Sequence, residues 1–197
     1  MADAPAPRIR PLPPQEARGG AAKALASPVG DMTIFRILAH AQTNIVPVMK
    51  LGGAILSDQQ LDARSRELML LALFALEGGR YEWAQHVEIA LDAGITEQEI
   101  TGIQRGDFQS GFSPRDQALL KFTETLISHP NVPGNIFSTV REFLDEREII
   151  EAIIAIGYYM MLVRLTESVD LGAEAVNGRN VILSLADRPL LAPAASK

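Results

Sequence analysis

The stretch that decides the fold reads Arg64-Ser-Arg-Glu-Leu-Met-Leu-Leu-Ala-Leu-Phe-Ala-Leu-Glu-Gly-Gly79. Leucine, alanine and methionine are strong helix formers, and they fill the run from Leu68 to Leu76 almost completely. The pair Gly78-Gly79 ends the run, because glycine adopts the left-handed conformation that commonly follows the last turn of a helix. The stretch therefore predicts a long, Leu- and Ala-rich helix over residues 64–77.

Helical patterns continue on both sides of this helix. Thr96-Glu-Gln-Glu99 matches a capping box, and Ser113-Pro114 matches an N-cap followed by proline at the first helical position. No pattern of paired strands is visible, so the fold class is all-α. We expect helices over residues 31–40, 45–56, 64–77, 80–93, 96–105, 113–128, 135–143 and 145–168.

The ends of the chain differ from this helical middle. Residues 1–29 hold six of the twelve prolines, and proline both fixes φ and removes a hydrogen-bond donor. We expect a flexible or subunit-wrapping arm over 1–29, a single all-helical domain over 30–170 and a C-terminal tail over 171–197. Within the tail, residues 180–186 fit either a short strand-like arm or one to two helical turns.

Composition removes several classes of function. The 197 residues include no cysteine, and 18 Lys and Arg stand against 24 Asp and Glu, a net charge of −6. The missing thiols exclude disulfides, thiolate nucleophiles and iron–sulfur clusters. The negative charge argues against a nucleic-acid or membrane-surface partner.

Two further signals concern location. The proline-rich N-terminus lacks the apolar core of a signal peptide. The most apolar window, Ala152 to Val163, has 12 residues, fewer than the roughly 20 that a bilayer span needs. We expect a buried helix there and a cytoplasmic protein.

Few residues could carry acid–base chemistry. Glu82 and His86 lie four residues apart on one predicted helix, beside the only tryptophan, Trp83, so the carboxylate and the imidazole share a helix face. A carboxylate next to an imidazole holds its orientation, as a general acid or base requires. The same spacing is also typical of an exposed ion pair. Glu67, at the entrance of the apolar run, is a second candidate, although a first-turn carboxylate also compensates the helix dipole.

Four other residues are weaker candidates for substrate contact, and one of them is Trp83 beside His86. Arg164 lies in apolar sequence and could hold an anionic group, or it could pair with Glu167 or with a carboxylate on another helix. His40 ends an apolar helix, and Tyr158 places a hydroxyl near the predicted core. The sequence has no HExxH motif, no histidines at metal-ligand spacing and no acidic calcium loop, so we expect no metal.

Three motifs in order give the chain a family resemblance. They are Arg66-Glu-Leu68, Glu82-Trp-x-x-His86 and Ala93-Gly-Ile-Thr-x-x-Glu-Ile100. With this spacing, residues 35–171 resemble the carboxymuconolactone decarboxylase family, which also contains the alkylhydroperoxidase D proteins. The resemblance implies an all-helical fold and a homo-oligomer, either a trimer or a hexamer.

The redox members of that family carry a glutamate, two cysteines separated by two residues, and a histidine. Laid on this chain, these positions are Glu67, Gly79, Glu82 and His86. Both sulfurs are missing, so a thiol peroxidase is excluded, because no thiol can be oxidised or resolved.

The decarboxylase members act on a carboxylated lactone without a metal or an organic cofactor. By this resemblance we expect no cofactor and a small carboxylic acid or lactone as partner. His86 would then transfer the proton, and Glu82 would orient the imidazole. Glu67 would either support these two residues without touching the substrate or relay a proton. An isomerase, hydratase or retro-aldolase would use the same groups, and a non-catalytic oligomeric binding protein is the alternative from another class.

Overall fold

The computed structural model describes residues 6–172 and residue 178. Throughout this part the regular elements are helices, so the all-α prediction is confirmed. The chain groups into two compact units, one formed by residues 59–167 and the other by residues 1–58 with 168–197. The predicted limits of one domain at residues 30 and 170 stay a prediction. Apart from residues 171, 172 and 178, the predicted C-terminal tail lies outside the described residues.

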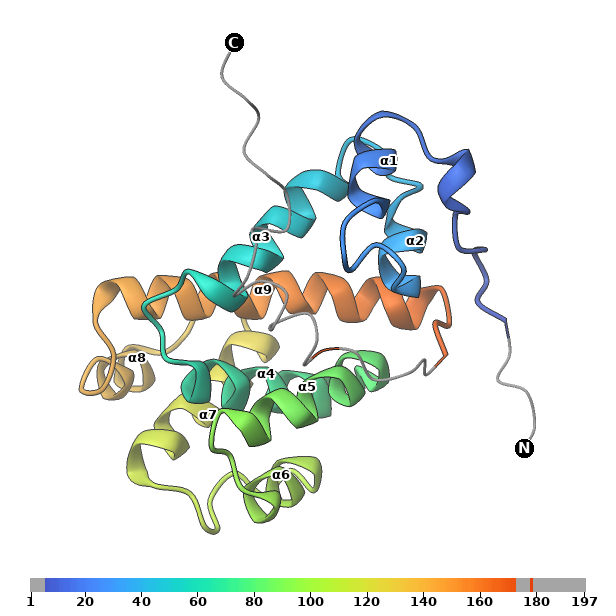
Figure 1. Ribbon diagram of the computed structural model, residues 1–197. Coiled ribbons are helices and arrows are strands. Elements are labelled where there is room, and N and C mark those ends of the chain that lie inside the picture. Colours follow the sequence, from blue (N-terminus) through green and yellow to red (C-terminus); the bar gives the residue numbers. More distant parts are fainter. Residues whose placement is uncertain (1–5, 173–177, 179–197) are drawn as a thin grey trace. The chain divides into compact units, whose positions relative to one another are not determined.

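Helix α4 is the centre of the unit formed by residues 59–167 (Figure 1). It runs over Ala63–Glu77, and every residue from Ser65 to Phe74 is buried. Asp62 caps its start by accepting a hydrogen bond from the Ser65 amide, and Gly78 ends it with φ of 73°. The other helices of the unit are α5 (Arg80–Asp92), α6 (Glu97–Gln104), α7 (Pro114–Ser128), α8 (Gly134–Val140) and α9 (Glu146–Ser168).

Helices α5, α6 and α7 all pack against α4. The predicted capping box of α6 is present between Thr96 and Glu99, and Ser113 caps α7 through the Asp116 amide. Arg64 at the start of α4 forms ion pairs with Glu99 and Asp116, so one guanidinium joins the first turns of three helices. These contacts fix the start of α4, which carries the candidate site in its next turn.

Helix α9 is the longest helix among the described residues. By length and composition alone it could cross a membrane, but half of its most apolar window is buried inside the protein, and a core helix passes the same test. The buried residues of the predicted window include Ala152, Ile156, Tyr159 and Val163. Three large apolar side chains on α9 remain exposed, Ile150, Ile154 and Met161.

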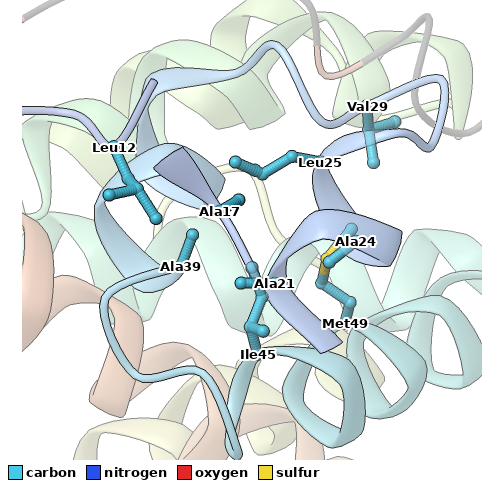
Figure 2. Close-up of a cluster of buried hydrophobic side chains, with 9 residues drawn as sticks. All are labelled: Leu12, Ala17, Ala21, Ala24, Leu25, Val29, Ala39, Ile45 and Met49. Atoms are coloured by element: carbon cyan, nitrogen blue, oxygen red, sulfur yellow. The ribbon is translucent and has the colours of Figure 1, made fainter. Parts of the chain in front are cut away.

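The other unit contains η1 (Pro14–Glu16), α1 (Gly19–Leu25), α2 (Thr33–Leu38) and α3 (Ile45–Ser57). Within the segment 1–29, which we expected to form a flexible or subunit-wrapping arm, residues 14–16 and 19–25 are helical. The reason is packing, because Ala21 and Ala24 are small and let α1 bury one face against Ile45 and Met49 of α3. Figure 2 shows this cluster of buried apolar side chains. Proline content alone did not show that the alanine-rich segment can be buried.

Candidate active site

Three buried ionisable side chains meet between α4 and α5. The two oxygens of Glu67 have separate partners: Oε1 accepts from Arg66 Nε at 2.9 Å and Oε2 lies 2.7 Å from His86 Nδ1. Glu67 is fully buried, and Arg66 and His86 are each 6% exposed. An ionised carboxylate only accepts hydrogen bonds, so Nδ1 carries the proton in this contact. Within the described part of the chain, His86 Nε2 has no hydrogen-bond partner.

The charge of Glu67 is stabilised by its two partners. Burial alone raises the pKa of this carboxyl, but the positive charge and hydrogen bond of His86, followed by those of Arg66, outweigh burial and leave the pKa of Glu67 below its ordinary value. The carboxylate is therefore ionised at neutral pH. The contact with Glu67 occupies Nδ1 and leaves Nε2 as the ring nitrogen that can exchange a proton with a ligand.

Aromatic rings surround the imidazole. The ring centroid of His86 lies 5.1 Å from Phe74 and 4.9 Å from Tyr159, with Tyr159 perpendicular to it. Tyr158 continues the cluster, 5.2 Å from Tyr159. Burial raises the pKa of both tyrosine hydroxyls, so both are neutral over the ordinary pH range. Trp83 is partly buried on the same helix as His86. The imidazole is thus held between apolar ring surfaces, where electrostatic interactions are strong.

The structure gives the imidazole a different carboxylate partner from the one we predicted. Glu67 orients His86, whereas the carboxyl of Glu82 lies against the Thr166 hydroxyl of α9, with oxygen–oxygen distances of 2.9 and 3.1 Å. Burial raises the pKa of Glu82, and it outweighs the opposing effects of the residue's own backbone amide, of Thr166 and of His86. Helical spacing placed Glu82 and His86 on one face, but it could not show that a side chain from another helix would take the imidazole.

The weaker candidates have other partners. Arg164 Nη1 lies 2.7 Å from Glu77 of α4, and its side chain is more than half exposed. Of the alternatives left open for Arg164, the structure has the ion pair with a carboxylate on another helix. His40 belongs to the other unit, is exposed, and has its Nε2 2.9 Å from the Arg10 carbonyl oxygen.

Sequence reasoning missed two residues of this arrangement, Arg66 and Thr166. Arg66 is one of two arginines at the start of α4. Helical phase does not distinguish them, because every residue from Ser65 to Phe74 is buried, so the positions three and four residues after either arginine are buried alike. No sequence signal identifies Thr166, because its contact with Glu82 joins residues 84 positions apart.

Comparison with known proteins identifies the scaffold. The model of the carboxymuconolactone decarboxylase family matches residues 47–125, which include α4 and α5 and therefore Arg66, Glu67 and His86. The predicted resemblance to this family is therefore confirmed. A curated relative, the uncharacterized protein YdfG of Bacillus subtilis, is 28% identical over 99 residues, which are 49% of this chain and 67% of that protein.

Solved structures show the same fold at low identity. An uncharacterized peroxidase-related protein from Ralstonia eutropha, with an alkylhydroperoxidase AhpD core, has a TM-score of 0.74 at 15% identity and covers 86% of this chain and 93% of its own. A second structure is that of a protein of unknown function from Agrobacterium tumefaciens, whose suggested role is antioxidant defence as AhpD. Its TM-score is 0.63 at 21% identity, and the match covers 70% of this chain and 95% of that protein. The debrominase Bmp8 has a TM-score of 0.68 at 14% identity, and the match covers 90% of this chain and 97% of Bmp8.

The two positions that, by the family resemblance, correspond to the cysteines of the redox members lie side by side. A Cβ atom added to Gly79 would lie 3.3 Å from Glu82 Oε2 and 2.7 Å from Val163 Cγ2. Among residues 6–172 and residue 178, no group of three or more metal-ligating side chains is found. The described site contains the carboxyl groups of Glu67 and Glu82, the imidazole of His86 and the guanidinium of Arg66.

Proposed function

We propose that this protein is a cofactor-independent acid–base enzyme, a lyase that decarboxylates a small carboxylated lactone or a related enolisable acid. The observation that carries the proposal is the buried contact between Glu67 and His86, which leaves Nε2 without a partner among the described residues. The match of residues 47–125 to the carboxymuconolactone decarboxylase family model supports the substrate class.

The chemistry needs one group that can both hold and give a proton. When a carboxylate leaves as CO₂, its electron pair passes into the neighbouring carbonyl and forms an enolate, which must then be protonated at carbon. His86 can perform this exchange at Nε2 because Glu67 holds the imidazole by Nδ1 and fixes its tautomer. Arg66 keeps the Glu67 carboxylate in place from the other side.

The names of two structural relatives describe a peroxidase-related protein and an antioxidant defence role, and the complete absence of cysteine argues against a thiol-dependent form of either activity in this chain. A peroxidase that works through a thiol needs a sulfur to oxidise and a second to resolve it. Debromination is the activity named for a third relative. At 14% identity that likeness extends to the fold, so we do not propose it for this chain.

Turnover tests the proposal directly. Purified protein is incubated with γ-carboxymuconolactone and with a panel of γ-lactone acids and β-keto acids, and CO₂ release is measured. We expect wild-type turnover of at least one compound and a loss in His86→Gln of about 10²-fold or more, the usual contribution of a general acid or base. His129→Gln is the matched control, because this histidine is exposed at the end of α7.

Assembly is measured in parallel by analytical ultracentrifugation, since we also propose a homo-oligomer, a trimer or a hexamer. His86→Gln is expected to assemble as the wild type does. Equal turnover in His86→Gln and the wild type would overturn the site assignment. A wild type that binds the acids without converting any of them would favour the non-catalytic binding protein.

A further inference from the structure

Two neighbouring rings of the candidate site carry polar atoms that lack hydrogen-bond partners. One is His86 Nε2 and the other is the Tyr159 hydroxyl, and neither bonds to any residue that the structure describes. Both side chains are buried, since His86 is 6% and Tyr159 is 5% exposed. A buried tyrosine hydroxyl usually has a protein partner, because bulk water no longer supplies one. Two missing partners on adjoining rings therefore indicate a place where a ligand completes the hydrogen bonds.

Neither of these atoms is sealed in the interior. Among the described residues, the side-chain atoms that are fully enclosed and also lack a partner are Ser27 Oγ and Gln59 Oε1. His86 Nε2 and the Tyr159 hydroxyl are not among them, so each keeps a small accessible surface. A small molecule can therefore reach both atoms.

The charges that act on the Tyr159 hydroxyl place it among the ionisable groups of the site. Burial, the largest effect, raises its pKa well above the ordinary value. The negative charges of Glu67 and Glu82 raise the pKa further, and the positive charge of Arg66 lowers it. The hydroxyl thus lies within electrostatic reach of the carboxylate that holds the imidazole. Since it stays neutral, it keeps its hydrogen and can donate it to a ligand.

The neighbouring Tyr158 differs in this respect. Its ring lies 5.2 Å from that of Tyr159, but in the described part of the chain it makes no ring contact with His86. Burial raises the pKa of Tyr158, and no charged side chain of the described site adds to the shift. Of these two tyrosines of α9, Tyr159 is therefore the one whose hydroxyl belongs to the site. The predicted substrate contact of Tyr158 is the alternative.

We propose that the Tyr159 hydroxyl donates a hydrogen bond to the substrate carbonyl oxygen on which negative charge develops as CO₂ leaves. This inference rests on the proposed function and adds a second catalytic residue to it. A donor aimed at a developing oxyanion commonly contributes about 10²–10³-fold to kcat. Phe74, whose ring centroid lies 5.1 Å from His86 and 5.6 Å from Tyr159, adds an apolar surface. Such surroundings strengthen a hydrogen bond to an anion.

The electron balance gives the two residues separate tasks. The bond between the substrate and its carboxylate breaks, CO₂ leaves, and the electron pair forms an enolate. Tyr159 holds the enolate oxygen by a hydrogen bond and keeps its own proton throughout. His86, protonated at Nε2, then gives a proton to the enolate carbon as the carbonyl re-forms. Solvent returns a proton to the imidazole, so each turnover releases one CO₂ and takes up one proton.

Thermal unfolding separates this role from a structural one. Tyr159→Phe removes an oxygen that has no hydrogen-bond partner among the described residues, and the loss of an unpaired buried donor is not expected to destabilise the fold. Tyr158→Phe is the matched variant, because it removes the same atom from the adjacent residue. We expect the Tm of Tyr159→Phe to be no lower than that of the wild type. A drop in Tm larger than that of Tyr158→Phe would make the hydroxyl structural and would overturn the proposal.

Ligand contact is measured without turnover. The probe is 4-nitrophenolate, a planar oxyanion that resembles an enolate, and the protein carries ¹³C at the ζ carbons of its three tyrosines. Tyr159→Phe and Tyr158→Phe assign the NMR resonances. We expect the probe to move the Tyr159 resonance more than those of Tyr158 and Tyr81, and to bind Tyr159→Phe about 10-fold more weakly than the wild type. No binding, or a Tyr159 resonance that does not move at saturation, overturns the proposal.

The catalytic part is tested on a compound that the wild type converts. We expect Tyr159→Phe to lower kcat about 10²-fold or more with little change in KM, and Tyr158→Phe to lower it at least about tenfold less. The His86 Nδ1–H resonance should remain, as the contact with Glu67 is not altered. Wild-type kcat in Tyr159→Phe overturns the inference and leaves the proposed function standing. If the probe contacts Tyr159 but the wild type converts no compound, the proposed function and the catalytic role fail together, and the ligand contact stands.

Discussion

We expect Glu67→Gln to destabilise the folded protein by about 3–5 kcal/mol at pH 7, the usual cost of removing one partner from a buried ion pair. The substitution keeps the shape of the side chain but removes a charge that is fully buried between Arg66 and His86. The Arg66 guanidinium then stays in the interior without its carboxylate. The amide also cannot accept from both partners, because only one of its two polar atoms is an acceptor.

The lowered pKa of Glu67 also predicts how the stability difference changes with pH. The pKa of Glu67 in the folded state is lower than its ordinary value of 4.5. The stabilisation is therefore complete above about pH 4.5 and is lost as pH falls through the folded-state pKa. The difference in unfolding free energy between wild type and Glu67→Gln should be constant near neutral pH and should shrink in acid.

Urea denaturation followed by circular dichroism measures this difference. With a slope of about 2 kcal/mol per molar urea, a loss of about 4 kcal/mol moves the midpoint down by about 2 M. Glu77→Gln is the matched control on the same helix, because it breaks an ion pair with an arginine that is more than half exposed. Such pairs contribute about 0–1 kcal/mol. Equal losses in the two variants, or a Glu67→Gln loss that does not shrink in acid, would refute the reasoning.

Three further outcomes follow from the packing and charges. Gly79→Ala should cost about 1–3 kcal/mol in urea unfolding because its Cβ would lie 2.7 Å from Val163 Cγ2, and Val163→Ala in the same chain should recover part of the loss. Ser113→Ala should cost about 1 kcal/mol by removing the N-cap of α7, measured as a lower Tm. The unfolding free energy of Glu82→Gln should rise relative to that of the wild type as pH increases above 4.5. The reason is that the raised pKa of Glu82 makes the folded wild type lose stability in that range. Parallel plots of unfolding free energy against pH for the two proteins would contradict this.

Much of the helical unit could be predicted from local sequence. The expected helices over 64–77, 96–105 and 113–128 agree with α4, α6 and α7 within a few residues. Each of them begins or ends at a local signal, namely Gly78, the Thr96 capping box or Ser113-Pro114. Helix α1 had no such signal, and its stability comes from burial against α3, which is information that a local pattern does not contain.

The contacts of the candidate residues could not be predicted from the sequence. Glu67, Glu82 and His86 were all singled out, yet spacing paired His86 with Glu82, whereas the structure pairs it with Glu67, 19 residues earlier. Two residues four positions apart, such as Glu82 and His86, lie on the same face of a helix. The rotamer of each side chain then depends on its strongest available partner. For Glu82 that partner is the Thr166 hydroxyl of α9. Contacts between helices decide such choices, and sequence spacing does not encode them.

The packing around Gly79 bears on why this site suits acid–base chemistry. By the family resemblance, positions 79 and 82 are those of the two cysteines in the redox members. Here a side chain at position 79 would collide with Val163, and the Glu82 carboxyl already lies beside the same point. Two cysteine substitutions alone would therefore not rebuild a thiol pair, because Val163 would also have to move. The missing sulfurs are part of an arrangement in which Val163 packs over Gly79 and Glu82 reaches Thr166, and the loss of either contact would disturb the other.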